Sequence, residues 1–218
     1  MKKVFKKIVT WILRILTRIT IWRHKPQIIG IVGNLGKTET KEAIKEKLSK
    51  KFDCRANPRS YNTEIGLPLA VLYLPSGNSS FWAWFKILSR GISIALFSKK
   101  FPKILILELG AIFPGEMDYL LTIVQPKYLI CTNISLDFEA SSDELEIRAK
   151  EIEKAIKAVP KNGLVIINAD DPWLINIRDK ASAKIVSYTK ENESKDYPIL
   201  ISEVLNKELE LRVNNNDL

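Results

Sequence analysis

The sequence predicts an α/β fold built on a doubly wound, mostly parallel sheet. Three observations lead to this prediction: short, continuously apolar segments recur along the chain, helical patterns lie between them, and a glycine-rich turn follows the first apolar segment. Continuous apolar strands are typical of parallel sheets, because helices cover both faces of such a sheet. Ligands of a doubly wound sheet bind at the carboxyl ends of its strands, so we expect the functional residues there.

The strand segments are short runs rich in β-branched and aliphatic residues. They are residues 27–32, 103–109, 128–134, 164–168 and 184–188. A strong helical pattern covers residues 142–159 and stops at Pro160 and Gly163. The apolar residues within 199–213 predict one or two edge strands before a polar end.

Residues 81–101 form an aromatic-rich segment between two of these elements. The segment holds four of the eight Phe and two of the five Trp residues. We interpret it as a hydrophobic helix, or a helical pair, packed on the sheet; the alternative is an exposed apolar surface for a membrane or a partner. Lys86, Arg90 and Gly91 interrupt the segment, so it does not read as a membrane-spanning helix.

The net charge of +9 is concentrated at the N-terminus. Residues 1–25 hold eight Lys or Arg and no acid, which leaves 26 bases against 25 acids in the rest of the chain. The folded body is therefore close to neutral, and the sequence predicts no nucleic-acid-binding surface. Any attraction to a polyanion or a membrane belongs to the N-terminal segment.

The N-terminal segment reads as a basic amphipathic helix. Its apolar residues recur at helical spacing, opposite most of the bases: Phe5, Ile8, Ile12, Ile15, Leu16, Ile19 and Trp22. Charges interrupt it too often for the ~20 apolar residues of a bilayer span, and no small-residue cleavage site follows. We expect this helix to pack on its own domain or on a partner, with contact to an anionic membrane surface as the alternative.

Sulfur chemistry is limited to Cys54 and Cys131, which lie far apart without paired spacing. The sequence therefore predicts neither a disulfide framework nor a zinc cluster, and we expect a cytoplasmic protein.

The strongest local signal is the turn Gly30-Ile31-Val32-Gly33-Asn34-Leu35-Gly36-Lys37-Thr38, which lies between a predicted strand and a predicted helix. This order is that of a phosphate-binding loop (P-loop), whose glycines let backbone N–H groups surround an anion. Lys37 is placed to reach the β- and γ-phosphates of a nucleotide, and the Thr38 hydroxyl to bind Mg²⁺. The common pattern has a Gly where this chain has Ile31, so the spacing here is G-x-x-G-x-x-G-K-T.

This variant loop and the residues after it, GIVGNLGKTETKEAI, resemble the ATP-binding loop of the Mur ligases. Three further segments match in the same order. NPRSYNTEIGLPLAVL resembles the substrate-side Asn-Asn-Glu segment of the family, LILELGAIFPGEMDYLLTIVQPKYLICTNI its Glu-Met-Gly-Ala strand with the elements that follow, and KNGLVIINADDP its Asn-Ala-Asp-Asp segment near the nucleotide. The similarity covers about residues 26–190 and is strongest to the members that add D-alanyl-D-alanine to UDP-N-acetylmuramoyl-tripeptide.

The resemblance implies an ATP-dependent, amide-forming ligase of peptidoglycan precursor synthesis, or the central domain of one. Such ligases use ATP and Mg²⁺ to phosphorylate a substrate carboxylate, and an incoming amine then attacks the acyl phosphate. The carboxylate substrate would be UDP-muramoyl-peptide-like. Folate-polyglutamate and cyanophycin ligases share the loop and remain alternatives.

The matching motifs also imply site residues. The nucleotide-binding set is Gly33, Asn34, Gly36, Lys37, Thr38, Asn168 and Asp170, with Asp171 as the alternative to Asp170, and the substrate-side set is Asn62, Thr63 and Glu64. Glu108 resembles the Mg²⁺-binding acid of the family, and Lys150 the lysine that reacts with CO₂ and holds metal as a carbamate. The catalytic set is then Lys37, Glu108 and Lys150, and the metal set Thr38, Glu108 and Lys150. For Glu108 the alternative is an acid that caps a helix or pairs with a lysine. For Lys150 it is a solvated helix lysine, and for the Asn-Ala-Asp-Asp segment an ordinary turn at a strand end.

Three positions depart from the family pattern. The family generally has Gly-Pro-x-His after this Thr-Asn-Ile strand and uses the His at the metal site; residues 135–138 here read Ser-Leu-Asp-Phe, which leaves Asp137 as a candidate oxygen ligand. The sole histidine, His24, precedes the first strand and reads as a surface residue. Glu39 follows Thr38 where the family tends to have Thr or Ser, so it either suits the helix N-terminus or repels the nucleotide.

Length is the largest departure. Mur ligases usually carry an N-terminal domain for the uridine nucleotide and a C-terminal domain that closes over ATP, and neither fits in 218 residues. We expect residues 1–25 to form one helix and 26–218 the central domain, as a fragment, as a subunit completed by a second polypeptide, or as a degenerate relative. The competing hypotheses are a non-catalytic nucleotide-binding or membrane-associated scaffold and, less favoured, a transport or signalling ATPase.

Overall fold

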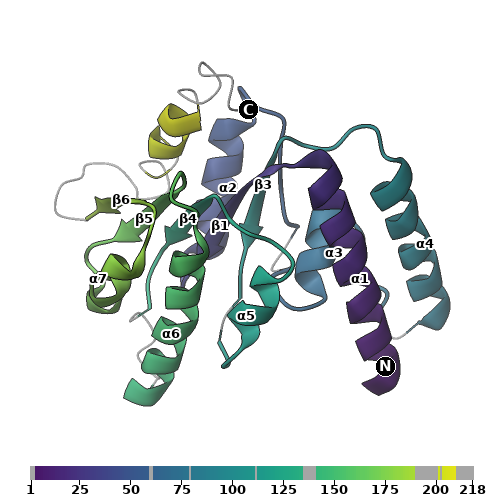
Figure 1. Cartoon of the computed structure of the whole chain (residues 1–218), viewed down its shortest axis with the longest axis horizontal. Helices are drawn as coiled ribbons and strands as arrows, with labels where there is room; N and C mark the ends of the chain where they lie inside the picture. The colour runs from purple at the N-terminus through teal and green to yellow at the C-terminus, as the bar shows by residue number, and fades with distance from the viewer. Residues whose placement is uncertain are drawn as a thin grey trace.

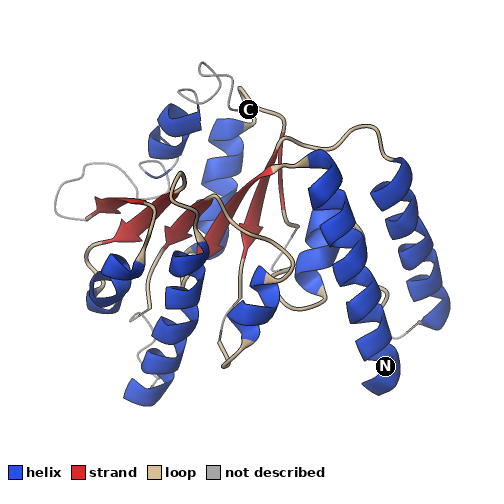
Figure 2. Cartoon of the chain, viewed as in Figure 1, coloured by secondary structure: helices blue, strands red, loops and turns tan. Residues whose placement is uncertain are grey.

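The computed structural model describes residues 3–58, 61–78, 80–110, 112–134, 141–189, 201 and 203–209. These residues form one sheet of six strands in the order β2-β3-β1-β4-β5-β6 (Figures 1 and 2). The strands are β1 (Gln27–Val32), β2 (Cys54–Ala56), β3 (Ile104–Glu108), β4 (Tyr128–Cys131), β5 (Leu164–Asn168) and β6 (Lys184–Tyr188). Every pair of neighbouring strands is parallel, which confirms the predicted doubly wound sheet.

The sequence predicted five of the six strands. The bounds of β1, β5 and β6 agree with the predicted ranges, and β3 and β4 lie inside theirs. The sixth strand, β2, spans three residues and holds the charged Arg55, so it gives no apolar run to detect. It forms one edge of the sheet beside β3.

Helices cover both faces of the sheet. On one face α2 (Lys37–Leu48) packs Ile44 and Leu48 against Ile29 and Ile31 of β1. The other face, which includes Ile28 and Val32 of β1, packs against α3 (Gly66–Leu72), α5 (Glu116–Leu121), α6 (Ser142–Ala158) and α7 (Pro172–Ile177), which runs into the short 3₁₀ helix η1 (Arg178–Lys180). Alternate side chains of one strand point to opposite faces, so β1 is apolar at every position after Gln27.

Helix α6 begins where the sequence predicts because two side chains satisfy its first N–H groups. The Ser141 hydroxyl accepts a hydrogen bond from the Glu144 backbone N–H, and the Glu144 carboxylate accepts one from the Ser141 N–H. This reciprocal capping box fixes the start of the helix, and Pro160 follows its end.

Helices α1 (Lys3–His24) and α4 (Phe81–Phe97) form a third layer, on the right of Figure 1. They pack against each other and against α3, which lies between them and the sheet. Val9, Leu13 and Leu16 of α1 are buried against these helices, so the expected packing of the N-terminal helix on its own domain is confirmed. Residues 81–97 form a single helix, one of the two forms expected, but this helix packs on α1 rather than on the sheet. A Cβ at Gly91 would lie 3.1 Å from Leu16 Cδ1, so the two helices approach closely there.

Two smaller expectations were wrong. The tail is not an edge strand: residue 201 and residues 203–209 are helical. Ile201, Leu205 and Leu209 recur every four residues and are buried against the α2 side of the sheet, which is the spacing of one helix face. His24 is half-buried rather than a bare surface residue, with its ring stacked on Phe101 at 5.0 Å.

Among the described residues, no helix has the length and apolar character needed to cross a bilayer.

Candidate functional site

The glycine turn connects β1 to α2 at the carboxyl edge of the sheet. Gly33 has φ 135° and Gly36 has φ 79°, a backbone region that side chains with a Cβ rarely adopt. A Cβ at Gly33 would also lie 2.1 Å from Thr132 Oγ1, whereas a Cβ at Gly36 would meet nothing within 4 Å. Gly33 is therefore required by both conformation and space, and Gly36 by conformation alone.

The end of β4 holds this turn in place. Asn133 accepts hydrogen bonds from the Asn34 N–H through its backbone oxygen (2.9 Å) and from the Leu35 N–H through Oδ1 (3.0 Å). The Asn133 side-chain amide and the Thr132 hydroxyl each donate to the Leu35 carbonyl at 2.8 Å. Neither Thr132 nor Asn133 was predicted from the sequence, although their position directly after a predicted strand is the available signal.

The first turn of α2 is open to an anion. Its N-cap, Gly36, has no side-chain hydrogen bond to the helix, so backbone N–H groups at the positive end of the helix dipole are available. Lys37 Nζ donates to the carbonyl oxygens of Gly33 (2.6 Å) and Asn34 (2.7 Å). Burial lowers the Lys37 pKa, Glu108 and Glu39 oppose this shift, and Arg148 lowers the pKa further. A bound polyphosphate would offset the burial and stabilise the charged lysine.

Thr38 and Glu108 meet beside the loop. The Thr38 hydroxyl donates to Glu108 Oε1 at 3.2 Å, and the Glu108 side chain is 1% exposed. Glu108 ends β3, next to Ile31 of β1, and its N–H donates to the side-chain oxygen of Asn57 at 3.1 Å. The parallel pairing of β1 and β3 thus brings together two residues that are 70 positions apart.

Lys41 also contacts Glu108; pairing of this acid with a lysine was the alternative for Glu108, but the sequence did not indicate which lysine. Its Nζ lies 2.8 Å from Glu108 Oε1, and both side chains are 1% exposed. One helical turn after Lys37, Lys41 points inward to the sheet. The pair is a buried ion bridge, so removal of either partner leaves an uncompensated buried charge.

The donor set fits a magnesium–nucleotide complex better than a self-contained metal centre. Thr38 and Glu108 offer oxygen ligands, and Mg²⁺ usually takes its other ligands from phosphates and water. Within the described part of the chain, no three His, Cys, Asp or Glu side chains gather around a point that could hold a metal ion.

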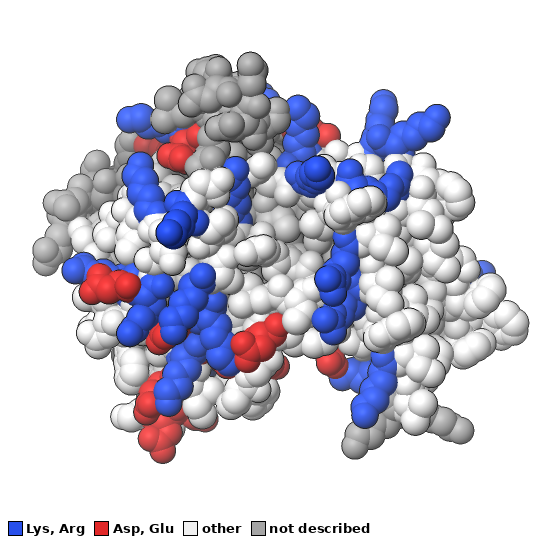
Figure 3. Space-filling model, in the orientation of Figure 1, with Lys and Arg blue, Asp and Glu red and all other residues white. Residues whose placement is uncertain are grey.

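A cleft of about 690 Å³ opens in front of the loop, between α1 and the α5–α6 side. Figure 3 shows basic side chains on both sides of this part of the surface. The predicted substrate-side residues Asn62, Thr63 and Glu64 line it, together with Lys37. The Asn62 carbonyl accepts from the Gly110 N–H (3.0 Å), Thr63 Oγ1 accepts from the Gly66 N–H (3.2 Å), and Glu64 pairs with Lys6 of α1.

Comparison with known proteins agrees with this arrangement. The family model described as the Mur ligase middle domain matches residues 90–214, which is more than half of the chain. The chain belongs to the Mur ligase family.

Similar curated proteins are UDP-N-acetylmuramoyl-tripeptide–D-alanyl-D-alanine ligases. The one from Borreliella burgdorferi is 30% identical over 189 residues (84% of this chain, 35% of the relative), and the one from Bacillus subtilis is 27% identical over 150 residues (69% and 28%). The chain spans about a third of the length of such relatives. Among solved structures, MurF ligase from Thermotoga maritima in complex with ADP has a TM-score of 0.61 at 25% identity (84% of this chain, 37% of that chain). A MurF structure from Acinetobacter baumannii shares the fold, with a TM-score of 0.62 at 20% identity (82% and 34%).

Lys150 does not reach the cleft of this Mur ligase domain. Its Nζ lies 2.6 Å from Glu146 on the outer side of α6, where its side chain is 66% exposed. Arg148 lines the cleft instead, beside Lys37, Asn34 and Asn133. The structure therefore separates Lys150 from the metal and catalytic set in which we expected it, because packing of Ala149 and Ile152 fixes the rotation of α6.

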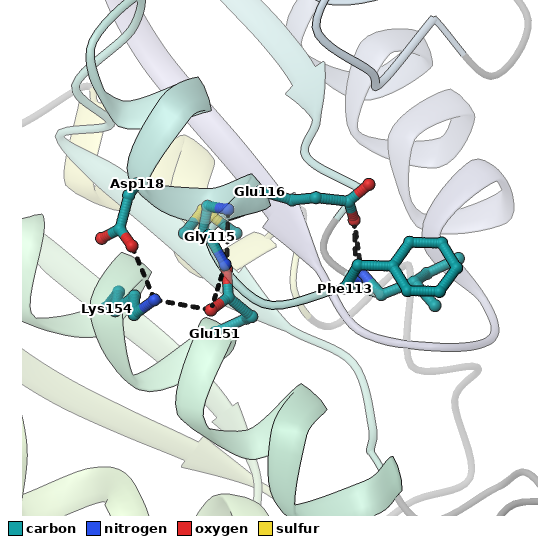
Figure 4. Close-up of polar contacts among 8 residues, drawn as sticks. Phe113, Gly115, Glu116, Asp118, Glu151 and Lys154 are labelled. Carbon is teal, nitrogen blue, oxygen red and sulfur yellow. Dashed lines mark hydrogen bonds and ion pairs between the residues drawn. The ribbon is translucent and has the colours of Figure 1, made fainter.

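Glu151, which follows Lys150 in α6, holds the loop between β3 and α5 in place in this Mur ligase domain. Its buried carboxylate accepts from the N–H groups of Gly115 (3.0 Å) and Met117 (2.8 Å) and pairs with Lys154 (2.6 Å), which also contacts Asp118 (2.7 Å) (Figure 4). On the cleft side of the same loop, Glu116 Oε2 accepts from the N–H groups of Ile112 (2.8 Å) and Phe113 (3.0 Å). These contacts hold one wall of the cleft.

The Asn-Ala-Asp-Asp segment lies at the end of β5. The Asn168 amide donates to the Thr132 carbonyl at 3.0 Å, and its oxygen accepts from the Asp170 N–H at 3.0 Å. Asp171 is buried, caps α7 through the Trp173 and Leu174 N–H groups, and accepts from the Ile134 N–H at 2.7 Å. Of these two acids, Asp170 is the exposed one. Glu39, at the start of α2, is also exposed. Asp137 lies outside the described residues.

Proposed function

We propose that this domain binds ATP with Mg²⁺ and carries the phosphoryl-transfer part of an amide-forming ligation in peptidoglycan precursor synthesis. The observation that carries the proposal is the meeting of Thr38 and Glu108 at 3.2 Å beside an uncapped helix start. The names of the similar curated proteins and the ADP complex of the similar T. maritima enzyme support the same reaction and cofactor.

In the proposed reaction, a substrate carboxylate oxygen attacks the γ-phosphorus of ATP, and ADP leaves. The amine of the second substrate then attacks the carbonyl carbon of the acyl phosphate, and phosphate leaves as the amide forms. Both steps gather negative charge in one place, so the main task of the protein is to neutralise and position anions. The start of α2 would supply backbone N–H groups, because those of Asn34 and Leu35 already donate to Asn133, and Lys37 would supply a mobile cation.

Thr38 and Glu108 would hold Mg²⁺, which would supply positive charge to offset that of the phosphates. Lys41 already neutralises one oxygen of Glu108, so this carboxylate would bind the ion with less net negative charge than a free acid. We assign Arg148, which lines the cleft, to neutralise negative charge there. This role differs from the metal-holding carbamate that we had expected at Lys150, since a carbamate is an anion and the Arg148 side chain a cation. Its guanidinium is permanently charged and suited to phosphate or carboxylate oxygens.

The remaining assignments follow from position. Asn168 and Asp170 would contact the adenine and ribose, with Asp170 the more exposed of the two. Asn62, Thr63 and Glu64 would face a UDP-muramoyl-peptide-like substrate in the cleft. We take residues 26–218 as the central domain and residues 1–25 as an added helix. The protein would work in the cytoplasm at the inner face of the membrane.

The test has a binding part and a reaction part. ATP with Mg²⁺ should raise the melting temperature of the protein through binding linkage, more than ATP with EDTA does. Mass spectrometry should then detect amide product and ADP from UDP-muramoyl-tripeptide, D-alanyl-D-alanine and ATP, with the remaining domains of a longer relative added in trans. No melting shift would refute the nucleotide site, whereas a shift without any product would favour the non-catalytic scaffold.

A further inference from the structure

Helix α4 presents an apolar face that nothing in the described structure covers. Six large apolar side chains are exposed on it: Phe81, Trp82, Phe85, Ile92, Leu96 and Phe97. Exposure reaches 71% for Trp82 and 73% for Phe97. Soluble monomers rarely leave a contiguous patch of this kind uncovered.

The helix cannot rotate to bury this face. Its opposite side is already packed, with Trp84, Ile87, Gly91 and Ala95 buried toward α1. Trp84 Nε1 donates to the Asn78 carbonyl at 3.0 Å, and Arg23 of α1 donates to the carbonyls of Ala95 and Ser98 beyond the last turn. The fold therefore holds the aromatic side chains outward.

The apolar surface continues onto α1 at the N-terminal end of both helices. The Phe5 and Phe81 rings lie 5.5 Å apart, and Phe81, Trp82 and Phe85 form a chain of ring contacts at 6.1 and 6.3 Å. Ile8 of α1 is 50% exposed. Two helices thus contribute to one surface, which we call the aromatic face.

The charge around the aromatic face is of one sign. The chain has no Asp or Glu before Glu39 and none between Glu64 and Glu108, while Lys86, Arg90, Lys99 and Lys100 lie exposed on α4 and directly after it. In Figure 3, no acidic side chain appears over α4, on the right of the view. Aromatic side chains among bases are typical of helices that lie in the interface of an anionic bilayer.

We propose that the aromatic face docks the protein on an anionic membrane surface, with α4 lying parallel to the bilayer. A second copy of the chain fits less well, because it would bring two sets of like charges together. Acyl chains accept the aromatic rings without shape complementarity, and anionic headgroups pair with the Lys and Arg side chains. Helix α4 thus adds to the N-terminal basic helix as a membrane contact: α1 buries Val9, Leu13 and Leu16 inside the protein but leaves Ile8, Trp11 and Trp22 exposed.

Docking in this orientation would also bring the cleft close to the bilayer. Helix α1 packs against α4 on one side and supplies Lys6 to the cleft on the other. The cleft would therefore lie one helix, about 10 Å, from the surface of the bilayer. A substrate held near the inner face of the membrane could enter the cleft without leaving that layer.

Cosedimentation of the full chain with vesicles tests the docking. We expect binding to vesicles of phosphatidylglycerol and phosphatidylcholine, weaker binding at high salt, and little binding to phosphatidylcholine alone. Phe85→Ser with Phe97→Ser should lower the partition coefficient by at least about tenfold, because two apolar rings no longer enter the bilayer. Phe113→Ser is the matched control, since Phe113 is 65% exposed but lies on the cleft loop.

A second variant, Lys86→Glu with Arg90→Glu, keeps every apolar contact and should also weaken binding to the anionic vesicles. Absence of binding to these vesicles, or equal binding by the Phe85/Phe97 variant and its control, would overturn the proposal. So would a concentration-dependent dimer in analytical ultracentrifugation that the same Phe substitutions abolish, because the occupant would then be a second copy. The ATP-induced melting shift should persist in all variants, so failure of the docking and failure of the nucleotide site are separate results.

Discussion

The two walls of the cleft differ in how closely they keep the family pattern. On the loop wall, Gly33, Lys37, Thr38 and Glu108 come together as the motifs imply, and buried hydrogen bonds from Asn133 fix the loop. On the α6 wall, Lys150 points outward, and Arg148 lines the cleft. The loop wall thus keeps the residues that the family motifs imply, whereas the α6 wall presents Arg148 to the cleft where we expected Lys150.

This difference separates residues that stabilise the fold from residues that would serve the reaction. The loop wall is tied to the core through the buried Lys41–Glu108 pair. The α6 wall presents side chains that are at least partly exposed, among them Arg148. Substitutions on the two walls should therefore differ in the size of their effect and in the property that they change.

The largest effect should come from the buried ion pair of the loop wall. Lys41→Met leaves Glu108 charged and unpaired in the core, which should lower the free energy of unfolding by about 3–5 kcal/mol. Urea denaturation measures this loss. Adding Glu108→Gln should restore most of the stability, and Lys150→Met on the other wall should change it little; equal losses for Lys41→Met and Lys150→Met would show that the pair has no such role.

The next effect concerns nucleotide affinity. Lys37→Ala should weaken ATP binding by roughly 10–100-fold, because one charge-assisted contact to phosphate is worth about 1.5–3 kcal/mol. Isothermal titration calorimetry gives the affinity directly. The matched control is Lys50→Ala, whose lysine is 67% exposed at the other end of α2; comparable weakening there would mean that general charge, and not the loop, attracts ATP.

The two glycines of the loop should differ in their tolerance of a methyl group. Gly33→Ala should lower stability by about 1–3 kcal/mol, because the new Cβ meets both a strained φ and the Thr132 hydroxyl. Gly36→Ala faces the conformational strain alone, about 1 kcal/mol, since nothing lies within 4 Å of its Cβ. Thermal denaturation of the two variants should rank them in this order, and the reverse ranking would contradict the close contact between Gly33 and the end of β4.

The smallest effect should separate neighbours on α6. Arg148→Ala should weaken ATP binding several-fold, up to about tenfold, because its cation faces the anion site across the cleft. Lys150→Ala should leave the affinity unchanged. If Lys150→Ala weakened binding and Arg148→Ala did not, the α6 wall would match the family role that we first expected for Lys150.

Much of the fold could be predicted because the spacing of apolar residues along the chain indicates which side chains are buried. Strands β1, β5 and β6 were predicted with their bounds, since most of their residues are apolar or β-branched, as is typical of strands in a parallel sheet. The tail was misassigned because a short apolar run fits either a strand or a helix, and only its packing on the sheet shows that Ile201, Leu205 and Leu209 form one helix face. The helical character of the α4 segment could be predicted. Its packing on α1 could not, because the residues of α4 alone do not show which element lies beside them.

The sequence by itself determined the local chemistry of the loop: which backbone positions need glycine, where the lysine and hydroxyl follow, and which strand ends in an acid. Tertiary structure alone decided which distant groups meet them. Successive residues of an α-helix turn by about 100°, so Arg148 and Lys150 point about 200° apart. Which of the two faces the cleft depends on how α6 packs its buried side against the sheet. In the same way, the burial of Lys41 against Glu108 depends on the pairing of β1 with β3, because local sequence fixes the direction of a side chain along its own element but not what lies opposite.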